Sequence, residues 1–170
     1  MDERENSMKK IMYSFACILS IVALASCGSM PIAPIEDQSL QKVHAIDLTK
    51  NEIYDISLEW MAQSLTDYSE VFELKDKDKG KIIGKGIVSF YGKVSWGWDI
   101  IPCRVTMIVE AKDNTYRTTY TNFIGFWGRN YSKPKPLEKK ENYDALKAKL
   151  SLIDDRLYNY LKKYKSNANW

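Results

Sequence analysis

Five segments of the chain alternate hydrophobic and polar residues or collect β-forming residues, and this pattern predicts five β-strands. They are residues 41–48, 71–75, 81–91, 100–111 and 116–121. Alternate residues share one face in the last two segments: Cys103, Val105, Met107 and Val109, then Tyr116, Thr118 and Tyr120. Because only short polar turns separate the last four strands, their spacing is typical of an antiparallel meander.

Two other segments carry hydrophobic residues at helical spacing. The first starts after Thr49, and Glu52 follows three residues later, where it can complete a capping box. This helix runs to about Leu65 and has the broad apolar face of a helix buried against a sheet. The second starts at about Glu138 and carries a narrow seam: Tyr143, Leu146, Leu150, Ile153, Leu157, Tyr160 and Tyr164. The seam packs on the sheet or pairs with another helix, and the helix is long enough to project beyond the domain.

The order of strand, capped helix and four-stranded meander resembles a family of bacterial lipoproteins known only as domain of unknown function 4468. Residues 51–60, 78–86 and 105–116 carry this resemblance, which extends over roughly residues 40–125. The family is described as having a TATA-binding-protein-like fold. The resemblance therefore implies an α+β domain (β-α-β-β-β-β-α), in which a curved antiparallel five-stranded sheet carries both helices on one face. The matching residues contain no catalytic motif, and a fold comparison does not imply DNA binding.

The N-terminal segment has the layout of a secretory signal. Lys9 and Lys10 precede an apolar run at residues 11–23. That run is about a dozen residues long, whereas a membrane-spanning helix needs roughly 20. Leu24-Ala25-Ser26-Cys27 follows and resembles the bacterial lipobox, which implies cleavage between Ser26 and Cys27 and attachment of lipid to the Cys27 thiol. The alternative is an ordinary cleaved signal in which Cys27 is incidental, and Met8 is an alternative start of the chain.

This layout predicts four segments of the chain. They are a signal peptide at 1–26, a lipidated flexible tether at 27–40, the α+β domain at 41–131, and a linker with the long amphipathic helix at 132–170. Acyl chains on Cys27 anchor the protein stably to a membrane. No acidic residue immediately follows Cys27, so we expect a protein that is anchored to the outer membrane and faces the periplasm.

The composition excludes several classes of chemistry. A net charge of +3 is too weak to indicate nucleic-acid binding. Cys103 is the single cysteine outside the signal and the lipobox, and its place in a strand predicts a buried, inert thiol. His44 is the only histidine, which we expect at a sheet surface, so neither a zinc site nor a histidine-based catalytic triad is predicted. Four carboxylates, Asp154, Asp155, Glu52 and Glu59, lie on amphipathic helices, where solvated faces are expected.

Two groups of aromatic residues are the best candidates for a binding surface. The candidate residues are Trp96, Trp98, Phe126 and Trp127, in loops predicted at residues 92–99 and 123–131. Alternatively, these rings close the open ends of the sheet. The sequence favours a non-enzymatic binding or structural module without metal, cofactor or catalytic residues, and an envelope hydrolase with a carboxylate-based site is the alternative. Its expected partners are the membrane, through the lipid, and an envelope protein, through the C-terminal helix or the aromatic loops.

Overall fold

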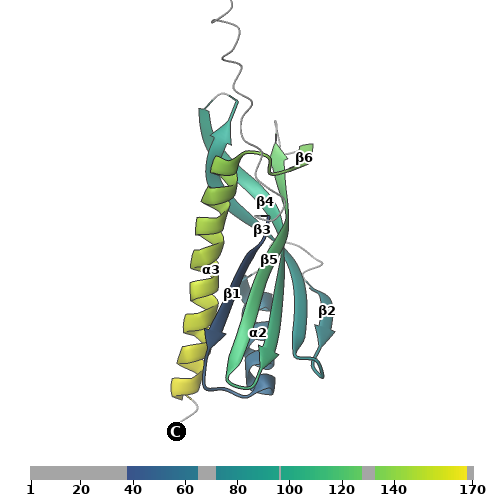
Figure 1. The fold of residues 1–170 in the computed structure, drawn as a ribbon, viewed down its shortest axis with the longest axis vertical. Coiled ribbons are helices and arrows are strands. Elements are labelled where there is room, and N and C mark those ends of the chain that lie inside the picture. The colour runs from purple at the N-terminus through teal and green to yellow at the C-terminus, as the bar shows by residue number, and fades with distance from the viewer. Residues whose placement is uncertain (1–37, 65–71, 96, 128–132, 168–170) are drawn as a thin grey trace, which may run out of the picture. The chain divides into compact units, whose positions relative to one another are not determined.

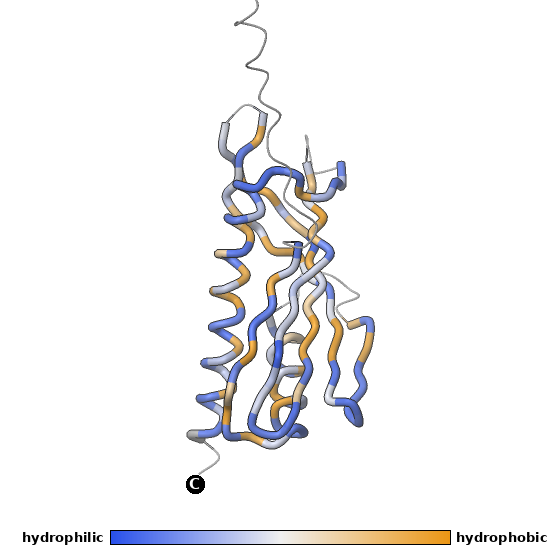
Figure 2. The backbone as a smooth tube through the Cα atoms, viewed as in Figure 1, coloured by the Kyte–Doolittle hydropathy of each residue, from blue (hydrophilic) through white to orange (hydrophobic). Residues whose placement is uncertain are grey.

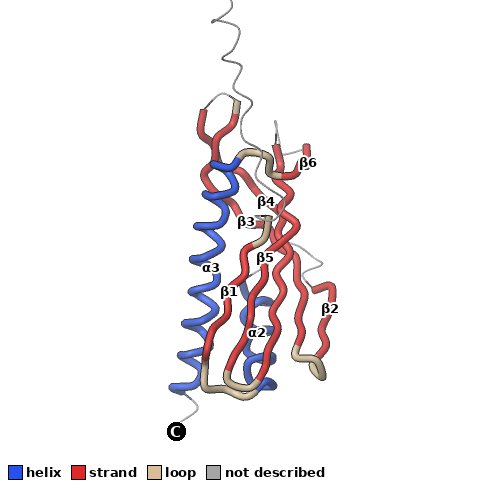
Figure 3. Tube along the Cα trace, viewed as in Figure 1, coloured by secondary structure: helices blue, strands red, loops and turns tan. Residues whose placement is uncertain are grey.

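A computed structural model describes residues 38–64, 72–95, 97–127 and 133–167. The predicted signal peptide, the lipobox with Ser26 and Cys27, and Trp96 lie outside these residues. The described elements are β1 (Leu40–Ala45), α2 (Lys50–Ser64), β2 (Phe72–Asp76), β3 (Lys81–Val94), β4 (Gly97–Lys112), β5 (Thr115–Trp127), β6 (Lys133–Pro136) and α3 (Lys140–Asn167). Figures 1 and 3 show the strands as one sheet with the two helices packed against it.

The sheet is antiparallel, with the strand order β1-β5-β4-β3-β2, and β6 pairs with β5. The predicted α+β class, the meander and the helix positions are therefore confirmed. The sheet has six strands and not five, because the segment Lys133-Pro134-Lys135-Pro136 pairs with the last four residues of β5. Proline cannot donate a backbone hydrogen bond, so this segment does not have the pattern of a strand, although an edge strand tolerates it.

Two strands are longer than predicted, and this changes the position of the aromatic residues. β3 and β4 continue as a hairpin to Val94 and Gly97, through the predicted loop at 92–99. β5 continues to Trp127, through the first part of the predicted loop at 123–131. Trp98, Phe126 and Trp127 therefore lie on strands, where successive side chains point to opposite faces.

Helix α2 begins as its sequence predicts. The backbone amide of Thr49 donates to Glu52 Oε2 at 2.8 Å, and the Glu52 amide donates to Thr49 Oγ1 at 3.3 Å. These two bonds form the predicted capping box. The buried side of the helix consists of Ile53, Tyr54, Ile56, Ser57, Trp60 and Met61, so the predicted apolar face lies in the core.

Helix α3 packs on the sheet along its length. Tyr143, Leu146, Leu150 and Leu157 of the predicted seam are buried, and so is Leu161 near the end of the helix. Lys165 Nζ still reaches Asp47 Oδ2 at 2.5 Å. The helix therefore stays in contact with the domain up to Lys165, and the prediction that part of it projects beyond the domain is wrong for this stretch. The reason is that strands of 13–16 residues extend for about 45 Å, as far as a helix of 28 residues.

One face of the sheet and both helices share a single hydrophobic core. The alternation of hydrophobic and polar residues along the strands is visible in Figure 2. Cys103, Val105, Met107 and Val109 are all buried on the core face of β4, as predicted. Cys103 has no exposed surface, and burial raises the pKa of its thiol to about 12. The predicted inert thiol is thus consistent with its environment.

Candidate functional site

The described aromatic candidates lie in three different environments. Trp98 is 55% exposed and stacks on Tyr91, with the ring centroids 5.8 Å apart. Phe126 is half-buried beneath the Arg104 guanidinium, which lies 5.2 Å from the ring centroid. Trp127 follows Phe126 directly on β5 and therefore points to the opposite face of the sheet. Only Trp127 of these three lines the cleft described next.

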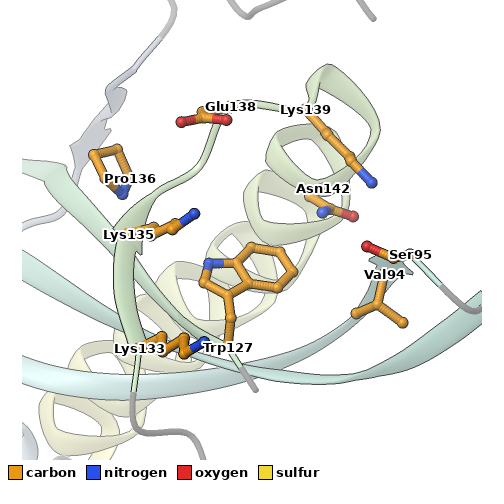
Figure 4. Close-up of a pocket in the computed structure, with 9 residues that line it drawn as sticks. All are labelled: Val94, Ser95, Trp127, Lys133, Lys135, Pro136, Glu138, Lys139 and Asn142. Carbon is orange, nitrogen blue, oxygen red and sulfur yellow. The ribbon is translucent and has the colours of Figure 1, made fainter.

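Trp127 lies in a cleft of about 310 Å³ between the end of β5, β6, the end of β3 and the start of α3. Figure 4 shows its indole ring in the middle of the cleft, surrounded by polar side chains. The lining residues are Val94, Ser95, Trp127, Lys133, Lys135, Pro136, Glu138, Lys139 and Asn142. The sequence interpretation included Trp127 in its binding surface but missed the lysines and Asn142.

The register between β5 and β6 explains why two lysines lie beside the indole ring. Trp127 pairs with Lys133, and Gly125 pairs with Lys135. Paired residues of an antiparallel sheet point to the same face, so both lysines lie on the Trp127 side. The alternation Lys-Pro-Lys-Pro was the sequence signal for this arrangement, and it becomes informative only once β6 is recognised as a strand.

Gly125 leaves room for the indole ring. A Cβ atom at this position would lie 3.0 Å from Trp127 Nε1 and 3.1 Å from Leu137 Cδ2. Contacts this short require the neighbouring atoms to move. The absence of a side chain at Gly125 therefore allows the pyrrole edge of Trp127 to lie back over its own strand.

Asn142 connects α3 to the end of β3 at the back of the cleft. Its side chain is almost fully buried; its Oδ1 accepts from the Lys93 amide at 2.6 Å, and its Nδ2 donates to the Lys93 carbonyl at 3.0 Å. One side chain thus satisfies both backbone groups of a strand residue. This double hydrogen bond fixes the wall of the cleft before any ligand binds.

The cleft is electropositive. Among the described residues, Lys133, Lys135 and Lys139 line it together with one carboxylate, Glu138. No ion pair joins these three ammonium groups to another described residue, whereas lysines elsewhere pair closely, as Lys140 does with Asp144 at 3.0 Å. Three cations with one nearby anion favour negatively charged ligands.

A second polar cluster lies under β1 and is buried. Asp154 on α3 has no exposed surface, and its Oδ1 accepts a hydrogen bond from Thr118 Oγ1 at 2.5 Å. Its Oδ2 lies 2.6 Å from His44 Nε2 and 3.5 Å from Lys42 Nζ. The expectation of a solvated face at Asp154 is therefore wrong, because its helical position coincides with the buried seam at Leu150, Leu157 and Leu161.

Aromatic rings enclose this cluster. His44 stacks between Tyr116 and Tyr158, with ring centroids 5.0 and 5.1 Å away. It lies on the core side of β1, at the edge of the sheet, with 18% of its side chain exposed. The hydroxyls of Tyr116 and Tyr120 are buried without a hydrogen bond of ordinary geometry. Burial, and next the charge of Asp154, raise the pKa of both phenols. The arrangement connects β1, β5 and α3, and the cavity beside Tyr120, lined also by Leu150, has a volume of only about 20 Å³.

The other carboxylates considered from the sequence have structural partners. Glu52 completes the capping box of α2, and hydrogen bonds from Thr49 lower the pKa of its carboxyl group. Glu59 Oε1 accepts from Gln63 and from the Tyr160 hydroxyl, each at 3.0 Å. Asp155 lies 3.3 Å from Lys42. None of these carboxylates lines the Trp127 cleft, so the part of its lining that the structure describes contains no pair of acidic groups.

Two further features of the described residues bear on the site. They contain no group of three or more His, Cys, Asp or Glu side chains placed to hold a metal ion. Neither of the helices in this part of the chain is long and apolar enough to cross a membrane.

Comparisons with known proteins agree on the fold. Residues 41–124 match the family described as a domain of unknown function (DUF4468) with TBP-like fold. The crystal structure of a DUF4468 family protein from Bacteroides ovatus is 12% identical, with a TM-score of 0.56 over 77% of this chain and 88% of that one. A TBP-like protein from Parabacteroides distasonis is 14% identical, with a TM-score of 0.58 over 76% of this chain and 97% of that one. At these identities the likeness concerns the fold alone, and no curated protein matches this chain.

Proposed function

Because residues 41–124 belong to the DUF4468 family, which has a TBP-like fold and no known function, we infer the function from the site. We propose that this protein is a lipid-anchored binding module of the cell envelope, which presents the Trp127 cleft to a ligand in the periplasm. The observation that carries the binding role is the cleft itself, with an aromatic ring and three lysines around a cavity of about 310 Å³. Small-molecule sites combine apolar surface with a few polar groups in this way.

The lipobox at residues 24–27 supports the anchor and the location. The small residues Ala25 and Ser26 fit a signal peptidase, and Cys27 supplies the thiol for a diacylglyceryl group. Two or more acyl chains hold a protein stably on a bilayer. The ten positions from Gly28 to the start of the described residues at 38 are enough chain to separate the anchor from the domain.

Labelling with radioactive palmitate in growing cells tests the anchor. The unchanged protein should incorporate palmitate and fractionate with the outer membrane, and Cys27→Ser should abolish both. Cys103→Ala is the matched control, because it removes the other cysteine of the mature chain and should leave labelling unchanged. A Cys27→Ser protein that still takes up palmitate would refute the proposed anchor.

A photoreactive amino acid at a lysine position tests the binding role in intact cells. We expect light-dependent adducts when it replaces Lys135 in the cleft. The same amino acid at Lys112, which is the exposed last residue of β4, is the control and should give none. Equal adducts at both positions, or none at Lys135, would count against a ligand in this cleft.

A further inference from the structure

The indole ring of Trp127 provides a flat apolar surface inside the cleft. The ring is half-buried and is held at one edge over Gly125. Figure 4 shows it between Lys135 and Lys133 on one side and Asn142 and Ser95 on the other. A large aromatic ring with one polar N–H group suits a ligand that has both an apolar face and hydroxyl groups around its rim.

The lysines supply positive charge on both sides of that ring. Lys133 and Lys135 extend from β6, and Lys139 lies across the cleft, on the segment just before α3 (Figure 4). The first turn of α3 adds the partial positive charge of a helix N-terminus on the same side as Lys139. The positive charges therefore surround the indole ring and do not converge on one point. This arrangement suits a ligand that stacks on the indole and carries an acidic substituent better than it suits a lone small anion.

The volume limits the size of the ligand. A cleft of about 310 Å³ is at the lower end of the range of roughly 300–1,000 Å³ that is usual for small-molecule sites. We infer that the cleft binds a short acidic saccharide, with one or two sugar rings, through stacking of a ring on Trp127 and ion pairs from a carboxylate or phosphate group to the lysines. This inference rests on the proposed function, because a module exposed at the envelope meets saccharides and not the cytoplasmic nucleotide pool.

Isothermal titration calorimetry on the full chain, purified from membranes in detergent, tests the ligand class. Digalacturonate and galactobiose form a matched pair that differs in the carboxylates, and galactose 1-phosphate carries the acid as a phosphate. We expect the better of the two acidic probes to bind at least about tenfold more tightly than galactobiose. Its affinity should fall as salt is raised, because salt screens the lysines. The order of the two acidic probes distinguishes a carboxylate source from a phosphate source.

Two variants assign the binding to this cleft. Lys133→Ala with Lys135→Ala should weaken the acidic probe about tenfold and leave galactobiose unchanged. Both lysines are exposed and outside the core, so this variant should fold normally. Trp127→Phe should weaken acidic and neutral probes alike. Lys112→Ala and Trp98→Ala are the matched controls at exposed positions outside the lining of the cleft, and they should change nothing.

Several results would overturn the inference. One is equal affinity for digalacturonate, galactose 1-phosphate and galactobiose, and another is an acidic probe that binds the double lysine variant as tightly as the unchanged protein. Tighter binding of adenosine monophosphate than of either acidic sugar would indicate that Trp127 stacks on a nucleobase and not on a sugar ring. A neutral sugar that binds through Trp127 as tightly as the acidic probes would refute the acidic class and leave the proposed binding role intact. The palmitate experiment tests the anchor separately.

Discussion

Replacing Asp154 with alanine should destabilise the domain far more than the same replacement at Asp155. The two residues are adjacent on α3 and have the same side chain. Asp154 has no exposed surface, whereas the side chain of Asp155 is 58% exposed. Each carboxylate lies within 3.5 Å of the Lys42 ammonium, so the pair differs mainly in burial and in the bonds to Thr118 and His44.

The expected magnitude follows from the groups that lose their partner. Without the Asp154 carboxylate, the buried hydroxyl of Thr118 has no acceptor, which costs about 1–3 kcal/mol. Lys42 keeps Asp155 as an ion-pair partner, and His44 is partly exposed and can be rehydrated. Removing one member of a buried ion pair costs about 3–5 kcal/mol in general, and we expect Asp154→Ala near the lower limit of this range. Asp155→Ala should cost less than about 1 kcal/mol, as for an exposed ion pair.

Urea unfolding at pH 7, followed by far-ultraviolet circular dichroism, measures both free energies of unfolding. The dependence on urea should have the same slope in both variants if the unfolding remains two-state. Asp154→Asn should fall between the two alanine variants, because its amide oxygen can still accept from Thr118 Oγ1. Equal losses at the two positions would refute the reasoning, since burial would then not decide the cost.

Three further predictions concern single residues outside the cleft. Because burial raises the pKa of Cys103 to about 12, its thiol should resist iodoacetamide at pH 8 until the protein is unfolded, and its contribution to stability should be present below pH 9 and lost as the pH rises toward 12. Thr49→Ala should cost about 1 kcal/mol in urea unfolding. It should also reduce the loss of stability as the pH falls below 4.5. The pKa of Glu52 is lowered by the backbone hydrogen bond from residue 49, which the variant keeps, and by the side-chain hydrogen bond from Thr49, which it removes. Gly80→Ala should lower the melting temperature at a cost of about 1–3 kcal/mol, because Gly80 has a φ of 63° and a Cβ there would lie 2.5 Å from the Ala111 carbonyl oxygen.

The parts of the fold that were predictable from the sequence are those that local patterns determine. The start of α2 was predictable because Thr49 and Glu52 are three residues apart and bind each other without help from the rest of the chain. The buried face of β4 followed from strict alternation between Cys103 and Val109. The capping box and the alternation both predict the observed structure correctly because the tertiary contacts favour the same local conformations.

The polar clusters could not be predicted because their partners come from distant parts of the chain. Asp154 is found on a helix with many charged residues, which usually indicates a solvated face. Its partner His44 lies 110 positions earlier, and neither residue alone indicates the pair. The lysines of the cleft were missed for a related reason. Their strand, β6, contains two prolines, so it does not show the residue pattern from which a strand is normally inferred.

The geometry of the cleft depends on contacts at the start and in the middle of α3. Asn142 binds the backbone of β3 near the start of the helix, and Asp154 binds β1 and β5 twelve positions later. Twelve residues of α-helix correspond to about 18 Å and to a rotation of about 120° relative to the first residue. The two polar side chains therefore point in different directions from one helix, one toward β3 and the other toward β1. A helix held in this way cannot rotate or slide without breaking a buried contact, so Lys139, just before the first turn of α3, keeps its position across the cleft from Lys133 and Lys135.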